Sequence, residues 1–207
     1  MNDTDPKRGL DVPRETLARL ETFVELLKTE NERQNLVSSG SLDDVWTRHI
    51  ADSLQLVRHA PADAPNWLDL GSGAGFPGLL IPLVHPATVT LVESRRLRIE
   101  FLRSAACALG IADRVEILHS RAESAPTREF AVISARAFAP LDRLLALAER
   151  FSTEETVWIL PKGRNAESEL DRVRSSWQGE FRLEPSETDP DARIIVARGV
   201  RRRARRP

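Results

Sequence analysis

The segment best suited to chemistry is a glycine loop that reads Asp69-Leu70-Gly71-Ser72-Gly73-Ala74-Gly75-Phe76-Pro77-Gly78. It follows a short apolar run and leads into a helical pattern, which places it at the carboxyl end of a predicted strand. Glycines there permit a tight turn and let backbone amides approach a ligand closely. The N-terminus of the following helix adds a partial positive charge. The loop therefore predicts a binding site for a cofactor.

Two classes of cofactor compete for this loop, and the spacing of the glycines favours one of them. A dinucleotide fingerprint needs Gly-x-Gly-x-x-Gly, but a phenylalanine stands at the sixth place counted from the strand. That pattern recurs from Gly73 to Gly78, so the match is weak. A strand-end acid followed by Gly-x-Gly-x-Gly, here Asp69 to Gly75, is similar to the first motif of class I methyltransferases that use S-adenosylmethionine. We therefore expect Gly71, Gly73 and Gly75 to shape a site for S-adenosylmethionine.

Later strand ends carry further candidates for cofactor binding. Glu93 closes the second predicted strand, 22 residues after Gly71. An acid that binds ribose hydroxyls is expected at a distance of about 20 residues. After the third predicted strand, the backbone amide of Ala122 and the carboxylate of Glu123 are candidate partners for the adenine edge. For each of these acids a solvated surface charge is the competing interpretation, and Glu93 does not discriminate between the two cofactors.

The elements that position these residues alternate between strands and helices. Short apolar runs predict strands at residues 67–70, 89–92, 115–118, 130–133 and 156–160, followed by two more near 181 and 193–197. Helical periodicity predicts helices at about 77–84, 95–109, 141–151 and 165–177. We therefore expect an α/β fold, a Rossmann-like doubly wound and mostly parallel sheet over residues 66–198. Residues 1–65 are predicted to form a helical extension, with a capping box from Ser41 to Asp44 opening its second helix.

Composition places limits on the class of protein. The 207 residues include a single cysteine, which cannot form a disulfide within the chain. No apolar run approaches the length of about 20 residues that a membrane span requires, and the polar Met1 to Arg8 does not suit a signal peptide. We expect a cytoplasmic monomer without membrane contact. Residues 199–207 form a basic tail on an acidic body, which suggests a polyanionic partner or a solvated terminus.

Six segments carry a resemblance to a known family. They run in order from about residue 35 to 163: Asn35-Leu36-Val37, Arg48-His49-Ile50-Ala51-Asp52-Ser53-Leu54, the glycine loop, Ser120-Arg121-Ala122-Glu123, Arg136-Ala137-Phe138-Ala139 and Pro161-Lys162-Gly163. The chain resembles the 16S rRNA guanine-N7 methyltransferase G family, also called glucose-inhibited division protein B. The glycine loop is typical of the whole superfamily, whereas the second and fifth segments are far more selective.

The resemblance implies a function and a set of contacts. It implies methylation of N7 of a guanine in 16S rRNA, guanine 527, within the small ribosomal subunit. It implies S-adenosylmethionine contacts at Gly71, Phe76, Ala122, Glu123 and Arg136. Family members commonly read Ile-Ser-Arg-Ala-Phe, whereas this chain carries an additional alanine, Ala135, before Arg136. The direction of the Arg136 side chain is therefore left open.

The residues also indicate how the methyl group is transferred. An exocyclic amine target would call for Asp or Asn followed by Pro-Pro and an aromatic residue, which this chain lacks. Covalent catalysis would need a cysteine, and Cys107 lies in an apolar helical stretch where we expect it to be buried. Guanine N7 has a free lone pair, so direct in-line transfer requires positioning and no general base. We expect Arg136 to act as the catalytic residue, by pairing with the methionine carboxylate or by donating to the acceptor edge of guanine.

Several other polar side chains receive plainer interpretations. His49 and Asp52 stand three residues apart in a predicted helix, where we favour a structural role. Lys162 follows the fifth predicted strand, where a solvated lysine is more common than a phosphate contact. The remaining histidines show no ligand-like grouping, so we expect no metal.

Three rival functions stay open. A small-molecule methyltransferase would be active without ribosomal particles. An NAD-binding oxidoreductase would bind a dinucleotide, although the absence of tyrosine removes the Tyr-Lys pair of one large dehydrogenase group. A non-catalytic RNA-binding module would bind RNA and show no affinity for the cofactor.

Overall fold

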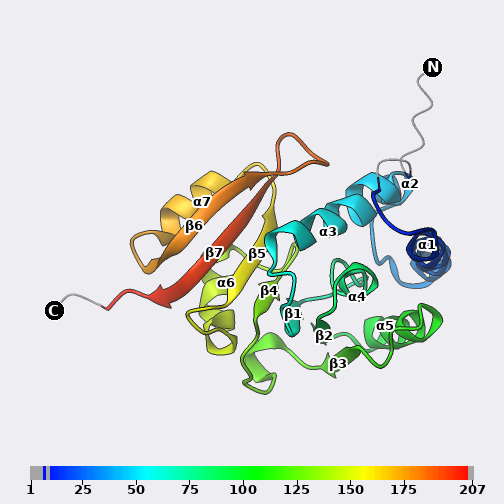
Figure 1. Ribbon diagram of the computed structural model, residues 1–207, viewed down its shortest axis with the longest axis horizontal. Coiled ribbons are helices and arrows are strands. Elements are labelled where there is room, and N and C mark those ends of the chain that lie inside the picture. Colours follow the sequence, from blue (N-terminus) through cyan, green and yellow to red (C-terminus); the bar gives the residue numbers. More distant parts are fainter. Residues whose placement is uncertain (1–6, 8–9, 205–207) are drawn as a thin grey trace.

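A seven-stranded sheet forms the centre of the computed structural model, which describes Lys7 and residues 10–204 (Figure 1). Its strand order is β3-β2-β1-β4-β5-β7-β6. The strands are β1 (Asn66–Leu70), β2 (Thr88–Glu93), β3 (Val115–His119), β4 (Val132–Ser134), β5 (Val157–Lys162), β6 (Trp177–Pro185) and β7 (Arg193–Arg202). The first five pair in parallel, and β7 pairs antiparallel with β5 and β6. The predicted doubly wound, mostly parallel α/β fold is confirmed.

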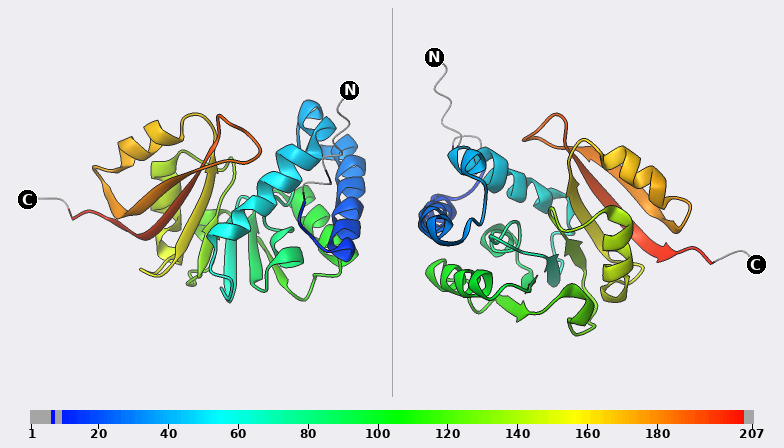
Figure 2. Two further views of the ribbon diagram at one scale, coloured as in Figure 1. Left: turned by 45° about the horizontal axis from the view of Figure 1, so that its top comes forward. Right: turned by 180° about the vertical axis from the view of Figure 1, so that it is seen from behind.

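Helices cover both faces of this sheet (Figure 2). The principal helices are α1 (Arg14–Gln34), α2 (Ser39–Asp43), α3 (Asp52–Leu54), α4 (Ile81–Val84), α5 (Arg96–Ala108), α6 (Leu141–Ala148) and α7 (Ala166–Val173). A π-helical turn, Trp46–Ala51, leads into α3, and a 3₁₀ turn, Gln55–His59, continues it. Further 3₁₀ turns lie at Ala122–Ser124 and Glu149–Phe151. In the part of the chain that the structure describes, no helix is long and apolar enough to cross a membrane.

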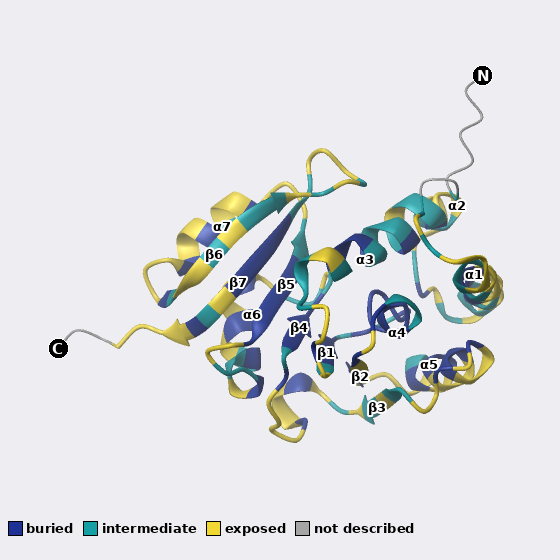
Figure 3. Ribbon diagram, in the orientation of Figure 1, coloured by how far each residue is buried: buried dark blue, intermediate teal, exposed yellow. Residues whose placement is uncertain are grey.

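The strands contribute to two hydrophobic cores because successive side chains point to opposite faces of a sheet. In β1, Trp67 packs in the core that contains α1, α4 and α5, while Leu68 and Leu70 pack in the core that contains α6 and α7. Burial on both faces explains why these strands read as continuous apolar runs in the sequence. Figure 3 shows the central strands as mostly buried and the outer strand β6 as mostly intermediate or exposed.

The N-terminal helices are part of the first core. Phe23 of α1 lies with its ring centroid 5.3 Å from that of Phe76, in an edge-to-face arrangement, and 6.2 Å from that of Phe101 on α5. Leu20, Phe23 and Leu27 are fully buried. Aromatic contacts of this kind stabilise the docked helix beyond the area they bury. The extension is therefore packed directly beneath the glycine loop.

Several element boundaries differ from the predictions. Helix α2 begins at Ser39, and the Ser38 hydroxyl caps it by accepting a hydrogen bond from the Ser41 amide at 3.3 Å, so the predicted capping box from Ser41 is wrong. The helix after the glycine loop starts at Ile81 because consecutive turns occupy residues 71–80. Trp177, predicted to end a helix, instead begins β6. Strand β7 runs to Arg202, so the first part of the basic tail is paired with β6.

Candidate functional site

The glycine loop turns sharply at the carboxyl end of β1. Gly71 has a φ of 70°, and its amide donates to the Val92 carbonyl at 2.9 Å. A Cβ atom at this position would overlap the ring of Phe138. Both the left-handed backbone and the close approach therefore require glycine here. The loop lies between the ends of β1, β2 and β4, where α/β proteins bind ligands.

Glu93 at the end of β2 is held in one orientation by backbone amides. Its Oε2 accepts from the Gly73 amide at 3.0 Å, and its Oε1 accepts from the Ser94 and Arg95 amides at 2.7 and 2.9 Å. The Arg98 guanidinium lies 3.5 Å from Oε2. A carboxylate fixed in this way is pre-organised to accept hydrogen bonds from a ligand's hydroxyls.

A cavity of about 440 Å³ opens between these ends, and we call it the smaller cavity. Its lining includes Gly71, Glu93, Ala122, Glu123, Phe138 and Arg143. The volume lies within the range of small-molecule sites, about 300 to 1,000 Å³. The groups in this lining fit the parts of S-adenosylmethionine. The Glu93 carboxylate suits the ribose hydroxyls, the Ala122 amide and the Glu123 carboxylate suit the adenine edge, and Gly71 leaves room for the methionine part. Four of the expected cofactor residues thus share one cavity.

The other expected cofactor residues lie elsewhere. Gly73 acts through its hydrogen bond to Glu93, and a Cβ at Gly75 would lie 2.6 Å from Leu79 Cδ1. The Phe76 side chain is buried in the core and does not line the smaller cavity. Arg136 lines a different cavity, described below.

Asp69 lies beneath the loop and is fully buried. Its Oδ1 accepts from the Ser134 hydroxyl at 2.8 Å, and that hydroxyl accepts from the Trp67 indole at 2.9 Å. Its Oδ2 has no hydrogen-bond partner among the described residues. Burial raises the pKa of Asp69 to about 6, opposed by the hydrogen bonds of Ser134 and Ser72 and by the charge of Arg136. The group therefore carries a costly buried charge near neutral pH.

The side chains of His49 and Arg136 both pack against the ring of Phe76. The His49 imidazole stacks on it, with centroids 4.9 Å apart and planes 16° apart, and the Arg136 guanidinium carbon lies 5.0 Å from its centroid. Both ring nitrogens of His49 are buried without hydrogen-bond partners among the described residues. Burial, followed by the charges of Arg136 and Arg48, lowers the pKa of His49 to about 4. His49 is thus a neutral packing residue, in line with the structural role predicted for it.

A second cavity of about 760 Å³, the larger cavity, adjoins the first. Residues from three distant regions line it: the helical extension gives Asp44, Arg48 and Asp52, the β4 and β5 ends give 136–140 and 161–163, and the β6–β7 turn gives 186 and 188–190. Ala137, Phe138 and Ala139 line both cavities. The two spaces are therefore separated by one short segment, in which Ala137 has a φ of 49°.

The Arg136 side chain points toward the helical extension. Its Nη1 lies 3.4 Å from Asp52 Oδ2 and donates to the Arg48 carbonyl at 3.3 Å. Burial lowers the pKa of Arg136, and Asp52 opposes that shift. The additional Ala135 is buried in the second core, so the chain accommodates it with Arg136 still facing the larger cavity.

Two predictions about single residues are wrong. Lys162 lies in β5 with its side chain only 11% exposed, where Nζ contacts Glu169 Oε2 at 2.9 Å and the Ala139 carbonyl at 3.1 Å. It fixes the segment between the two cavities and is not a solvated lysine. Cys107 is exposed, because α5 buries Ala105 and Ala106 and turns the next residue outward. Cys107 lines neither cavity, so it remains unsuited to covalent catalysis.

The sequence missed two parts of the larger cavity. The sequence predicts a structural role for Asp52 and gives no sign that its carboxylate faces Arg136. The β6–β7 turn carries no motif, and only the antiparallel return of β7 brings it back to the cavity. Among the described residues, no group of three or more His, Cys, Asp or Glu side chains is placed to hold a metal ion.

The strand order and the glycine loop at the end of β1 are those of the class I methyltransferase fold, which is Rossmann-like. Solved structures share this fold: an O-methyltransferase from Bacillus cereus in complex with S-adenosylhomocysteine has a TM-score of 0.60, with 16% identity over 93% of this chain and 94% of that one. A glycopeptide N-methyltransferase, MtfA, complexed with the same product has a TM-score of 0.59 and 13% identity over 72% of this chain and 89% of that one. At these identities the likeness establishes the fold alone.

The family follows from closer relatives. Residues 16–198 match the model of the GidB family, described as rRNA small subunit methyltransferase G, and the chain belongs to that family. It is 55% identical to the ribosomal RNA small subunit methyltransferase G of Rhizorhabdus wittichii, over 94% of this chain and 90% of that protein. The enzyme of the same name from Zymomonas mobilis is 49% identical, over 91% of this chain and 88% of that protein. The family resemblance predicted from the sequence is confirmed.

Proposed function

We propose that this enzyme transfers the methyl group of S-adenosylmethionine to N7 of a guanine in 16S rRNA, namely guanine 527. The observation that supports this most directly is the pair of adjoining cavities at the carboxyl ends of the parallel strands, divided by Ala137 to Ala139. The smaller cavity suits the cofactor, and the larger, more open one suits a nucleotide of the small subunit. A relative at 55% identity is named ribosomal RNA small subunit methyltransferase G, which supports RNA of the small subunit as the substrate.

Each side chain of the smaller cavity has a proposed role. Glu93 would accept hydrogen bonds from the ribose hydroxyls, and the Ala122 amide and Glu123 carboxylate would meet the adenine edge. Gly71 would leave room for the methionine part beside Phe138, since any side chain there meets that ring. Gly73 and Gly75 would shape the loop, and Phe76 would act by packing beneath it.

The chemistry needs alignment of the acceptor nitrogen with the methyl group. When bound, S-adenosylmethionine supplies a methyl carbon attached to a positively charged sulfur. The N7 lone pair forms the new bond to that carbon while the carbon–sulfur bond breaks with its electrons going to sulfur, and no proton is removed. Arg136 would donate a hydrogen bond to the guanine acceptor edge at O6, which leaves the N7 lone pair free, and its place in the larger cavity supports this role. Pairing with the methionine carboxylate is the alternative role.

The function can be tested on small subunits from cells that lack this gene. Incubation with labelled S-adenosylmethionine, followed by mapping of the modified nucleotide, should place the label on N7 of guanine 527. Label on an adenine, on protein or on free small molecules would refute the proposal. Calorimetry that shows binding of NAD, and of neither S-adenosylmethionine nor its demethylated product, would favour the oxidoreductase.

The role of Arg136 can be tested with Arg136→Ala. Loss of one well-placed donor typically lowers turnover by about 10²-fold or more. If Arg136 contacts guanine, the dissociation constant for S-adenosylmethionine should stay within about twofold of the wild type, and a large increase in it would indicate the carboxylate role instead. Arg103→Ala is the matched control, because Arg103 is exposed on α5 and lines neither cavity. Near wild-type turnover of Arg136→Ala would refute both roles.

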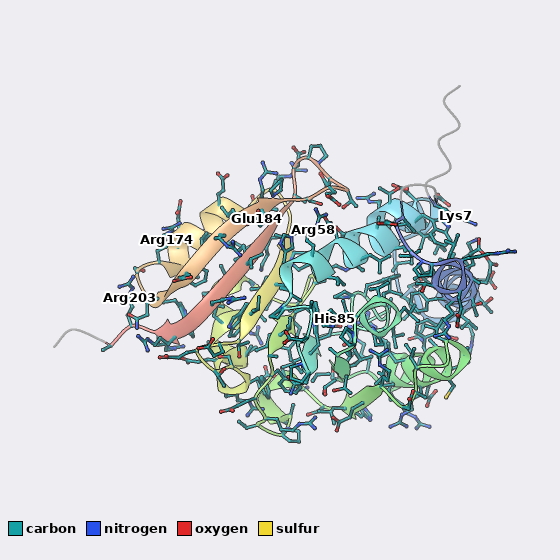
Figure 4. The ribbon with its side chains drawn as sticks, viewed as in Figure 1. Lys7, Arg58, His85, Arg174, Glu184 and Arg203 are labelled. Atoms are coloured by element: carbon teal, nitrogen blue, oxygen red, sulfur yellow. The ribbon has the colours of Figure 1, made fainter. Side chains whose placement is uncertain are left out.

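We further propose that the basic end of the chain contacts rRNA phosphates. Arg198 and Arg201 to Arg203 are exposed on or just after β7, and Figure 4 labels Arg174 and Arg203 together at that end of the sheet. The Arg202 guanidinium carbon lies 5.2 Å from the Trp177 ring centroid, and Arg203 Nε donates to the Trp177 carbonyl at 3.0 Å. Arg205 and Arg206 of the predicted tail lie outside the described residues. Phosphate contacts would make particle binding weaken with salt.

A further inference from the structure

The β6–β7 turn, residues 186–192, forms the outer wall of the larger cavity. Ser186, Thr188, Asp189, Pro190 and Ala192 all line that cavity. Within the turn, the backbone bonds that hold it are Ser186 to Ala192 at 3.3 Å and Ala192 to Asp189 at 3.1 Å. These bonds lie at the base and the far side of the turn. Residues 187 and 188 make no backbone–backbone hydrogen bond within the turn; the Thr188 amide donates to Ser186 Oγ at 3.2 Å, and the Glu187 amide bonds outside the turn.

Gln55, at the start of the turn that follows α3, supplies that support. Its Oε1 accepts from the Glu187 amide at 2.8 Å. Its Nε2 donates to Ser186 Oγ at 3.2 Å and to Thr188 Oγ1 at 3.3 Å. One amide side chain from the helical extension thus contacts three consecutive residues of the wall, more than 130 positions away in the sequence.

Asp52 connects the same turn to Arg136. Its Oδ1 accepts from Thr188 Oγ1 and from Gln55 Nε2, both at 2.9 Å, while its Oδ2 faces Arg136 at 3.4 Å. Arg58, one 3₁₀ turn further on and labelled in Figure 4, forms an ion pair with Glu187. Three polar residues of the extension, each three positions after the last, therefore contact the same turn.

The burial of Gln55 makes this arrangement specific. Only 7% of the residue is exposed, and a buried amide is tolerated when both its oxygen and its nitrogen are hydrogen-bonded. An apolar side chain would fill the same space at less cost in desolvation, but it would not fix the turn relative to Arg136. The hydrogen bonds of Gln55 therefore favour one position of the β6–β7 turn over others.

We propose that Gln55 is a positioning residue for the acceptor nucleotide, which acts by holding the β6–β7 turn against the larger cavity. This inference rests on the proposed function, because it assigns the larger cavity to an RNA nucleotide. Gln55 lines neither cavity and does not touch the residues assigned to the cofactor. Its loss should therefore weaken productive binding of the RNA and leave cofactor binding unchanged.

The test uses Gln55→Met, which keeps the length of the side chain and removes its hydrogen bonds. With small subunits from cells lacking the gene, KM for the particle should rise about tenfold, which corresponds to about 1.4 kcal/mol. The dissociation constant for S-adenosylmethionine should change less than twofold. Thr188→Val breaks the same network from the turn side, so the double variant should be little worse than either single variant.

Thr156→Val is the matched control for a loss of stability without a change in the wall. Thr156 is fully buried, donates to the Phe130 carbonyl at 2.7 Å and lies outside both cavities. It should lower the midpoint of unfolding and leave KM for the particle unchanged. An equal rise of KM in this control, or strictly additive effects of Gln55→Met and Thr188→Val, would overturn the inference.

The outcomes separate this inference from the proposed function. If the wild type leaves N7 of guanine unmodified in the particle, the proposed function fails and the inference fails with it. If the wild type modifies that position and both Gln55→Met and Thr188→Val keep the wild-type KM, the inference alone fails. Should Gln55→Met not fold, Thr188→Val decides the matter, because it changes a partly exposed residue of the turn itself.

Discussion

The buried carboxyl of Asp69 offers a prediction whose size follows from the structure. In Asp69→Asn, the amide oxygen can keep the Ser134 hydrogen bond, and the new amide nitrogen takes the place of the unpartnered Oδ2. The substitution removes a charge that burial disfavours and changes the volume very little. We expect the variant to be more stable than the wild type near neutral pH, although the position begins the glycine motif.

The size of the effect comes from the pKa, which burial raises from 3.8 to about 6. Such a shift corresponds to about 3 kcal/mol of differential interaction between the protonated and charged forms. Between pH 4 and pH 6 the folded protein holds more protons than the unfolded chain at this carboxyl. The free energy of unfolding of the wild type therefore loses up to about 3 kcal/mol through this group as the pH rises across that window, and the variant does not.

Urea unfolding followed by tryptophan fluorescence would measure this difference. The free energy of unfolding of Asp69→Asn minus that of the wild type should rise from pH 4 to pH 7 and then level off. Asp63→Asn, which alters an exposed carboxyl in a loop, should show no comparable trend. A difference that is independent of pH, or a variant that is destabilised most at pH 7, would refute the assignment of a costly buried charge.

Two further predictions concern the residues around the loop. Gly71→Ala should weaken S-adenosylmethionine binding, because the added methyl group overlaps Phe138. Gly110 has a similar φ of 65° and open space around it, so Gly110→Ala should lower only the free energy of unfolding, by about 1 kcal/mol. Equal cofactor affinity in both variants, by calorimetry, would contradict this. His49→Phe should be more stable than the wild type below about pH 6. The pKa of His49 is 6.5 in the unfolded chain and about 4 in the folded protein, so the unfolded chain takes up the proton first as the pH falls. The wild type therefore loses stability between pH 6.5 and about pH 4, and the variant does not. A stability difference that stays constant between pH 4 and pH 7 would count against the buried neutral imidazole.

Local spacing was enough to predict that Gly71 and Glu93 lie together at one edge of the sheet. Gly71 and Glu93 follow strand ends, and parallel strands bring their carboxyl ends to one edge, so position in the sequence translated into position in space. The same reasoning failed for Cys107, where a run of apolar letters hid the helical period: α5 buries residues 101, 102, 105, 106 and 109 and exposes the face between them.

The larger cavity could not be predicted because its contacts are not local. Asp52 reads as an ordinary helical carboxylate until Arg136 and Thr188 are folded against it. The turn at residues 186–192 has no motif, and its role depends on β7 inserting antiparallel between β5 and β6. Lys162 looked solvated because Glu169, its partner, belongs to the next helix. Each of these pairings is decided by tertiary packing.

The segment between the cavities makes cofactor and acceptor positions interdependent. Arg136, just before the segment, pairs with Asp52, and the carbonyl of Ala139 at its end accepts from Lys162. Between them, the ring of Phe138 lies against Gly71. A change at any of these anchors moves a wall that both cavities share, so it should alter cofactor affinity and acceptor binding together. Gln55 holds the opposite wall, which belongs to the larger cavity alone, and it reaches the shared segment only through its hydrogen bond to Asp52. The two kinds of support are therefore distinguishable by measuring both affinities in the same variant, and a shared loss after Gln55→Met would mean that the wall and the segment move as one body.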